Sequence, residues 1–185
     1  VINLAEGEIE LTVIPQIVPT STGVNIHFEA ANAGNVIQFL IYRSSGYWRG
    51  GLRDKHGTGF YHSLPYDGQE GIPTDIKLKW KNINSGSADA EVKAIINGVE
   101  KGHITGVQID MDPLTVAYIG RRANSESYYG DALYDDLRIS SIYRSDEDDI
   151  AAYESNQPLP VDQYTTLKLG FDGPDGQRGT AIVTL

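Results

Sequence analysis

The sequence of 185 residues contains no cysteine, and this absence excludes several kinds of chemistry. A disulfide bond, a thiolate nucleophile and a thiolate metal site all require cysteine. The sequence also has no long apolar run, basic leader or lipidation signal, so we expect no membrane insertion. A Gly-x-Ser-x-Gly motif and a glycine-rich phosphate loop are missing too. The chain fits an exported bacterial or bacteriophage protein that is stabilised by its core, although a cytosolic protein can also lack cysteine.

Positive charge is also scarce, since 15 lysines and arginines face 25 aspartates and glutamates, for a net charge of −10. A polyanion is repelled by nucleic-acid backbones and by anionic membrane surfaces, so we expect neither as a partner. The charge suits a soluble extracellular protein or one that gathers cations. The acidity can equally serve solubility alone.

The length fits one domain over residues 1–185, because all-β sandwiches of this size are commonly undivided. Apolar residues make up 40% of the chain, which is enough for a sizeable core. The chain enters a strand pattern almost at once, with VINLAEGEIELTV. We interpret it as a module of a longer polypeptide, whose other modules would be among its partners.

Alternation of apolar and polar residues with a period of two predicts β-strands through most of the chain. Val36–Tyr42 is apolar at nearly every position, which predicts a central strand covered on both faces. Ala90–Ile96 and Val99–Ile104 flank Asn97-Gly98, a pair that supplies the positive φ angles of a tight hairpin turn. Further strands are predicted over Glu8–Ile14, Val24–Ala30, Asp75–Lys81, Leu114–Ile119, Leu133–Ile139 and Thr165–Phe171.

One short helix is predicted near the C-terminal end of the chain. Ser145 can cap it, and Asp148 lies three residues further on to complete a capping box. Acidic residues crowd the first turn, where the helix dipole favours them. The remaining residues, 161–185, hold one more strand and an apolar end. They either complete this sandwich or begin another module, and we favour completion.

Four segments carry a resemblance to a known family. EGEIELTVIPQ has the pattern of an opening strand, DIKLKW contains an inward tryptophan at Trp80, and AEVKAIINGVEKGHIT forms a hairpin. The fourth segment is YIGRR…GDALYDDLRISSIYRSDEDDIAAY. Together they cover roughly residues 6 to 155 and resemble the corresponding elements of laminin-G-like domains of the concanavalin A-like superfamily. The linker at 157–161 further resembles modules of phage tail or surface proteins.

The resemblance implies an all-β fold, a two-sheet antiparallel jelly-roll sandwich with one short helix. Such sandwiches bind glycans or proteins more often than they cut them. The chain departs from the family because the usual first strand is missing at its N-terminus. Thr165–Phe171 ends in Phe-Asp-Gly as that strand does, and we hypothesise that it fills the same position.

Catalysis is not expected, and we predict that the chain is not an enzyme. Retaining glycosidases need two carboxylates about 5 Å apart. Laminarinase-type relatives carry them in a Glu-x-Asp-x-x-Glu run that this sequence lacks. Glu8 and Glu10 share a strand face, but a solvated outer face explains them. The histidines, His27, His56, His62 and His103, have no metal-ligand spacing.

Asp135 is the most unusual carboxylate in the pattern. Alternation with Leu137 and Ile139 predicts that it points into the core, where an unpaired charge is costly. The resemblance implies a structural calcium ion (Ca2+) near this position, with Asp131 and Asp172 as companions. The alternative is that Asp135 accepts hydrogen bonds from backbone N–H groups of a neighbouring loop.

A glycan site needs exposed aromatic faces and a few polar groups that hold hydroxyls. Such residues concentrate in YWRGGLRDKHGTGFYHSLPY, at positions 47–66. The candidate ligand-binding residues are Trp48, Arg49, Tyr61, His62, Tyr66, Asn25 and His27. We expect Trp48 or Tyr61 to stack on a sugar while the polar members form hydrogen bonds. Because adjacent strand residues point oppositely, either Tyr47 or Trp48 must face the core if they lie in a strand. The alternative for most of these candidate residues is that they pack in the core or at a sheet edge.

The sequence therefore predicts a non-catalytic module that recognises carbohydrate, either a polysaccharide or a cell-surface glycan, through a groove on one sheet. Its parent would be an extracellular or virion-associated protein. The main alternative is a structural or protein-binding module of a phage tail or surface assembly. An unusual glycoside hydrolase is the third.

Overall fold

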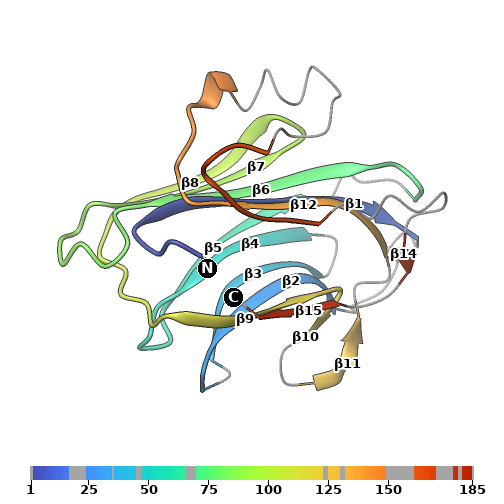
Figure 1. Cartoon of the computed structure of the whole chain (residues 1–185), viewed down its shortest axis with the longest axis horizontal. Helices are drawn as coiled ribbons and strands as arrows, with labels where there is room; N and C mark the ends of the chain where they lie inside the picture. The colour runs from blue at the N-terminus through green and yellow to red at the C-terminus, as the bar shows by residue number, and fades with distance from the viewer. Residues whose placement is uncertain are drawn as a thin grey trace.

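A computed structural model of the chain describes residues 2–16, 24–34, 36–44, 47–65, 70–122, 125–129, 132–148, 161–169, 177–178 and 181–184. Two antiparallel sheets lie face to face in this part of the chain, and their strands run across the molecule in Figure 1. Each sheet combines strands that follow one another along the chain with strands from distant segments of the sequence.

The first sheet contains the opening strand of the chain at its centre. Its order is β13 (Thr165–Leu169), β12 (Ala132–Ser140), β1 (Glu6–Pro15), β6 (Thr74–Lys81), β7 (Ala90–Ile96) and β8 (Val99–Val107), and β14 (Gln177–Arg178) also pairs with β12. Every pairing in this sheet is antiparallel.

The second sheet has the order β15 (Ala181–Thr184), β9 (Leu114–Ile119), β2 (Val24–Asn32), β3 (Ile37–Ser44), β4 (Tyr47–Arg53) and β5 (Gly59–Pro65). A separate two-stranded ribbon is formed by β10 (Arg121–Arg122) and β11 (Ser125–Tyr129). The ribbon packs against β2, on the side of the second sheet that faces away from the first sheet (Figure 1).

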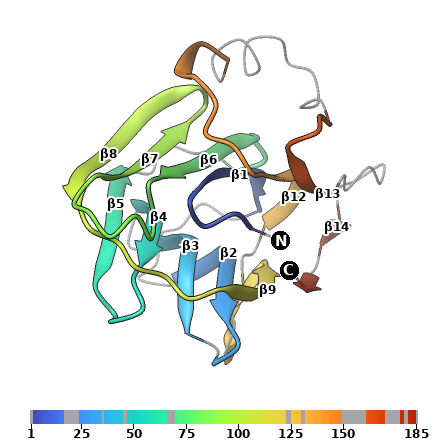
Figure 2. The same ribbon diagram turned by 60° about the vertical axis from the view of Figure 1, so that its left-hand side comes forward.

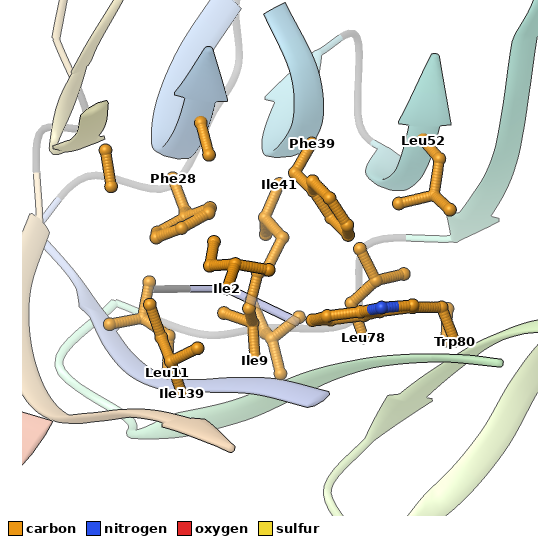
Figure 3. Close-up of a cluster of buried hydrophobic side chains, with 14 of the residues drawn as sticks. Ile2, Ile9, Leu11, Phe28, Phe39, Ile41, Leu52, Leu78, Trp80 and Ile139 are labelled. Atoms are coloured by element: carbon orange, nitrogen blue, oxygen red, sulfur yellow. The ribbon is translucent and has the colours of Figure 1, made fainter. Parts of the chain in front are cut away.

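The core fills the space between the two sheets, as Figure 3 shows. Ile9 and Leu11 of β1 and Phe28 of β2 are completely buried there, which follows from the alternation of their strands. Trp80, predicted to point inward, is also fully buried, and its Nε1 donates a hydrogen bond to the carbonyl oxygen of Asn3 at 3.0 Å. Its ring packs edge-on against Phe39 with 4.6 Å between centroids.

The predicted strands and hairpin are confirmed wherever the alternation was clear. Leu114–Ile119 is β9 as predicted, and β3 lies between β2 and β4 as a central strand. Asn97 and Gly98 have φ angles of 50° and 72°, the positive values that the tight turn between β7 and β8 requires. Among the strands that were not predicted, β4 and β5 are the longest, and their stretch contains paired glycines and scattered rings in place of an apolar alternation.

The single predicted helix begins where expected, with helical residues 146–148. The hydroxyl oxygen of Ser145 accepts a hydrogen bond from the backbone N–H of Asp148 at 3.2 Å, which is the capping contact predicted from the sequence. Nowhere in the described ranges does a helix have the length and apolarity needed to span a membrane.

The segment after residue 161 adds β13 and β14 to the first sheet and β15 to the second. Leu167 and Leu169 in β13 pair with Ile139 and Leu137 of β12, and β15 pairs with β9 at the corresponding edge of the other sheet. Figure 2 shows β13 and β14 on the same side of β12. The hypothesis that Thr165–Phe171 occupies a sandwich position required such pairing, and its described part, β13, is paired.

Candidate functional site

A hollow of about 210 Å³ lies on the outer face of the second sheet, the face that points away from the first sheet. The hollow is lined by Val24, Ile26, Glu29, Ile37, Leu40, Tyr42, Arg53 and Arg122. Ile26 and Leu40 are 3% and 8% exposed although they do not belong to the core between the sheets. The β10–β11 ribbon, packed against β2, walls one side of this face.

A β-bulge in β2 determines which side chains reach the hollow. Ile26 pairs with Tyr42 and Phe28 pairs with Ile41, so His27 is an extra residue in β2. Ile26 therefore faces outward while Phe28 faces the core, although strict alternation predicts that they share a face. Beyond the bulge, Glu29 faces outward and lines the hollow.

The bulge turns His27 into the interior, although strict alternation of β2 predicts that it lies on the polar face and the sequence names it as a ligand-binding candidate. Its ring is 1% exposed and lies 4.9 Å from the ring of Trp48, centroid to centroid. Its Nδ1 is 3.1 Å from the hydroxyl oxygen of Tyr134. Burial, together with the nearby charge of Arg43, lowers the pKa of His27 to about 3. The ring is therefore neutral at physiological pH and does not contact a ligand on either face.

Tyrosine and arginine side chains form pairs on the outer face. The Nη1 of Arg49 donates to the hydroxyl of Tyr42 at 3.2 Å, with its guanidinium 5.8 Å from the centre of that ring. The Nε of Arg53 donates to the hydroxyl of Tyr61 at 2.9 Å. Burial raises the pKa of Tyr61, so its hydroxyl stays protonated at neutral pH and keeps a proton to donate.

Two glycines make room for the ring of Tyr61. A Cβ built on Gly59 would overlap this ring, with 2.8 Å to Cζ, and one built on Gly51 would lie 2.8 Å from the Cα of Tyr61. The Gly51 Cβ would also overlap the backbone oxygen of Phe60. The ring is therefore held flat against the backbone of β4 and β5, with part of its surface in solvent.

Replacing Gly51 with alanine should lower the free energy of unfolding by about 1–3 kcal/mol, because the new methyl group meets the backbone of β5. The neighbouring Gly50 is a matched control, since nothing lies within 4 Å of a Cβ at that position. Alanine there should change stability by less than about 0.5 kcal/mol. Urea unfolding of the two variants measures the difference, and equal effects would contradict the tight packing at Gly51.

Of the seven predicted ligand residues, Arg49 and Tyr61 share the outer face. Trp48 is 1% exposed and belongs to the core, whereas Tyr47 is 45% exposed, so the predicted opposite orientation of these neighbours is confirmed. An exposed stacking ring at Trp48 was therefore a wrong prediction, caused by the missed β4. Tyr66 lies outside the described residues.

His62 and Asn25 point away from the hollow as well. His62 follows Tyr61 on β5, and its ring lies against Gly102 of β8, where a Cβ would overlap it. Burial lowers the pKa of His62. Asn25 accepts a hydrogen bond from the Nη2 of Arg43 at 3.3 Å. Arg43 is 2% exposed and pairs across the sheet with the buried Trp48, so Asn25 belongs to the polar end of the core.

Asp135 does not point into the core, because β12 contains a second bulge. Tyr134 and Leu137 are both core residues, and their separation of three positions places an extra residue between them. Asp136 has a φ of 44°, and its backbone N–H donates to Asp135 at 2.9 Å. The described ranges hold no group of three histidine or acidic side chains that could bind a metal ion. Asp131 and Asp172 lie outside the described residues, so the structural calcium stays a prediction.

Glu8 and Glu10 are buried, and the prediction that they lie on a solvated outer face is wrong. They are 0% and 3% exposed, although they face away from the core. The segment that follows β12 crosses this side of the first sheet, as Figures 1 and 2 show. Arg144 from that segment contacts Glu8, and Lys79 donates to the carbonyl oxygen of Arg144 at 2.5 Å.

This buried layer consists of charged pairs. The Nη2 of Arg138 lies 2.8 Å from Glu8 and 3.1 Å from Glu10, and the Nζ of Lys77 lies 3.4 Å from Glu10. Burial raises the pKa of Glu10 to about 7, although Lys77 and Arg138 act in the opposite direction. Because every carboxylate here is covered and paired, the layer gives no access to a substrate.

Six residues of the outer face were not predicted as site residues, namely Glu29, Tyr42, Arg53, Tyr118, Arg121 and Arg122. Tyr118 pairs across the sheet with Glu29, and the guanidinium of Arg121 lies 5.9 Å from the centre of its ring. The sequence did contain one signal for this face, the even spacing of Arg49, Gly51 and Arg53. A period of two puts both arginines on the same face of a strand. The prediction missed it because this stretch was not recognised as a strand.

No protein-family model matches the sequence, and no curated protein matches it. Solved structures do match the fold. A native heptameric SAP-like pentraxin from Limulus polyphemus aligns with a TM-score of 0.67 and 15% identity, over 98% of this chain and 83% of the pentraxin. The CBM40 of the Ruminococcus gnavus IT-sialidase, solved bound to α2,3-sialyllactose, aligns with a TM-score of 0.59 and 18% identity, over 81% of this chain and 83% of that domain.

The binding domain of botulinum neurotoxin serotype D aligns with a TM-score of 0.61 and 14% identity, over 83% of this chain but 38% of the toxin domain. These structures are jelly-roll sandwiches, and the predicted all-β jelly-roll fold with one short helix is confirmed. At such identities the likeness extends to the fold alone. The narrower resemblance to laminin-G-like domains and phage tail modules stays a prediction.

Proposed function

We propose that this chain is a non-catalytic carbohydrate-recognition module that binds a glycan at the hollow on the outer face of its second sheet. The observation that carries the proposal is the combination of tyrosine rings and guanidinium groups around a small hollow on a rigid sheet. Sugar sites combine an aromatic surface for the apolar face of the ring with polar groups that orient its hydroxyls.

Each tyrosine–arginine pair would serve both requirements. The half-buried ring of Tyr61 offers a flat surface supported by Gly51 and Gly59. Arg53 uses its Nε for the tyrosine hydroxyl, and its remaining N–H donors are available for ligand oxygens. Tyr42 and Arg49 repeat this arrangement on the neighbouring strands.

The arrangement of carboxylates supports a binding role rather than hydrolysis. Glycoside hydrolysis generally needs two carboxylates at the same sugar, about 5–10 Å apart. Among the described residues that line the hollow, Glu29 is the sole carboxylate. Glu8 and Glu10 belong to the other sheet, where Arg138 and Arg144 cover and pair them. The proposal includes an extracellular or virion-associated parent protein, with which the acidic, cysteine-free composition is compatible.

Replacing Tyr61 with alanine should weaken glycan binding by about ten- to a hundredfold, because a half-buried aromatic surface contributes about 1.5–3 kcal/mol. A glycan array first identifies a ligand for the wild-type protein. Isothermal titration calorimetry then compares the two proteins with that ligand.

The exposed Tyr164 provides a matched control, because it follows the covering segment of the first sheet and is 39% exposed. Alanine at Tyr164 should leave the Kd unchanged. Equal weakening in both variants would contradict a site on the second sheet. Failure of the wild-type protein to bind any array glycan would overturn the proposal in favour of a structural or protein-binding module.

A further inference from the structure

The arginines of this chain are distributed unevenly, and the outer face of the second sheet, with the ribbon beside it, carries a large share of them. Four of the eight arginines lie on the outer face of the second sheet or in the ribbon beside it: Arg49, Arg53, Arg121 and Arg122. Most of the lysines belong instead to the first sheet, in β6, β7, β8 and β13. A guanidinium presents planar, paired N–H donors that match the two oxygens of a carboxylate, whereas an ammonium group does not.

The charge of this face is opposite to that of the chain as a whole. Among the residues that line the hollow, two arginines, Arg53 and Arg122, face one carboxylate, that of Glu29, on a protein whose net charge is −10. The carboxylate of Asp54, directly after β4, binds the turn that follows it. It accepts hydrogen bonds from the backbone N–H groups of His56 at 2.9 Å and Thr58 at 2.7 Å. Composition alone therefore does not explain a basic face here.

Three of these arginines contact tyrosines rather than acids. Within the described part of the chain, Arg49, Arg53 and Arg121 form no ion pair with a carboxylate, and each instead contacts a tyrosine ring or hydroxyl. The Nε atoms of Arg49 and Arg121 are buried and have no hydrogen-bond partner there. Because these Nε atoms are closed to solvent, a ligand can reach these arginines only through the other N–H groups of their guanidinium groups.

On these observations, we infer that the glycan bound at the hollow carries a carboxylate, as sialic acids and uronic acids do. This inference rests on the proposed carbohydrate-recognition function and adds the class of sugar. The carboxylate binds the guanidinium of Arg53 at the hollow, with Arg122 on the opposite wall, and the sugar ring lies on the tyrosine surface. A hollow of about 210 Å³ admits one terminal or single acidic residue, with the rest of the glycan over the open face.

Matched ligands test the charge requirement directly. Binding is measured by calorimetry for α2,3-sialyllactose against its methyl ester and against lactose, and for tri-galacturonate against its methyl-esterified form. At least one free acid should bind at least about tenfold more tightly than its own ester, because a charge-assisted hydrogen bond is lost on esterification. Raising the salt from 50 to 500 mM should weaken that binding, since the site is open to solvent.

A variant tests the residue. Arg53→Gln, at an exposed position, should reduce the affinity for the acid at least about tenfold and leave the affinity for the ester unchanged. Lys101→Gln removes the same charge from an exposed position on β8 and should change neither affinity. Circular dichroism and a melting curve establish that both variants are folded.

The possible failures separate the two proposals. If acids and their esters bind equally well, the carboxylate inference is overturned and the carbohydrate-recognition function stands. The same holds if the protein binds a neutral glycan and Arg53→Gln leaves that affinity unchanged. Preference for a sulfated oligosaccharide such as heparin over both free acids also overturns it. No binding of any glycan overturns the proposed function itself.

Discussion

Replacement of Arg138 with methionine should lower the free energy of unfolding by about 3–5 kcal/mol at pH 8. Arg138 is 2% exposed and lies between the carboxylates of Glu8 and Glu10, at 2.8 and 3.1 Å. The variant keeps both carboxylates in the buried layer with one cation fewer. A carboxylate that has lost its partner is costly to hold away from water. Urea unfolding followed by tryptophan fluorescence measures the loss.

The effect of this substitution should depend on pH through Glu10. Burial raises the pKa of Glu10 to about 7 from its ordinary 4.5. The stabilising contribution of a carboxyl with a raised folded pKa is complete below pH 4.5 and is lost as the pH rises through 7. At pH 5.5 the Glu10 carboxyl is therefore protonated in the folded protein, and the loss caused by Arg138→Met should be smaller than at pH 8.

Two further variants make this result specific. Glu10→Gln in the Arg138→Met background should recover about 1–3 kcal/mol at pH 8, because the neutral amide needs no cation. Lys81→Met removes a cation of the same sheet that is 38% exposed, and it should cost less than about 1 kcal/mol. Losses that are the same at both pH values, with no recovery in the double variant, would show that Arg138 contributes through packing alone.

Acidification from pH 6.5 to pH 4.5 should remove about 2–3 kcal/mol of stability through His27 alone. Burial, aided by Arg43, lowers the pKa of His27 from 6.5 to about 3. The stability linked to a base with a depressed folded pKa is fully present above pH 6.5. It is lost as the pH falls toward 3, because the unfolded chain takes up the proton first. Near pH 3 the total loss approaches about 5 kcal/mol.

The contribution of His27 is measured by comparing unfolding of the wild type and His27→Gln at pH 7.5, 6.0 and 4.5. The variant should lack this part of the acid destabilisation, since glutamine does not titrate. His56→Gln, at an exposed position, should keep the wild-type profile. Comparison at each pH removes the opposite contribution of Glu10, which is common to all three proteins. An unchanged slope in His27→Gln would mean that His27 is not enclosed as described.

The strands that could be predicted from the sequence are those whose pattern reports burial on one face. Trp80 and the Asn97-Gly98 turn were identified correctly because side-chain alternation and backbone conformation are local properties. The fold class followed from enough such strands. The β4 and β5 strands were missed because Gly50 and Gly51 interrupt the apolar pattern, and with them the orientation of Trp48 was misjudged.

The candidate site could not be predicted for a different physical reason. A bulge adds one residue to a strand and reverses the face of everything beyond it, and no residue type specifies it. The bulges at His27 and near Asp136 therefore exchanged inward and outward positions in β2 and β12. Burial of Glu8 and Glu10 depends on a covering segment more than 130 positions away, which is tertiary information.

The addition of β13 to one sheet and β15 to the other has a consequence for how the chain is made. Until residues 165–184 have left the ribosome, the backbone N–H and C=O groups along β12 and β9 have no partner strand on those sides. Unprotected strand edges invite pairing with a second nascent chain. Both sheets are therefore complete only after residues 165–184 have been synthesised. A chain whose synthesis stops before these residues would be prone to aggregate.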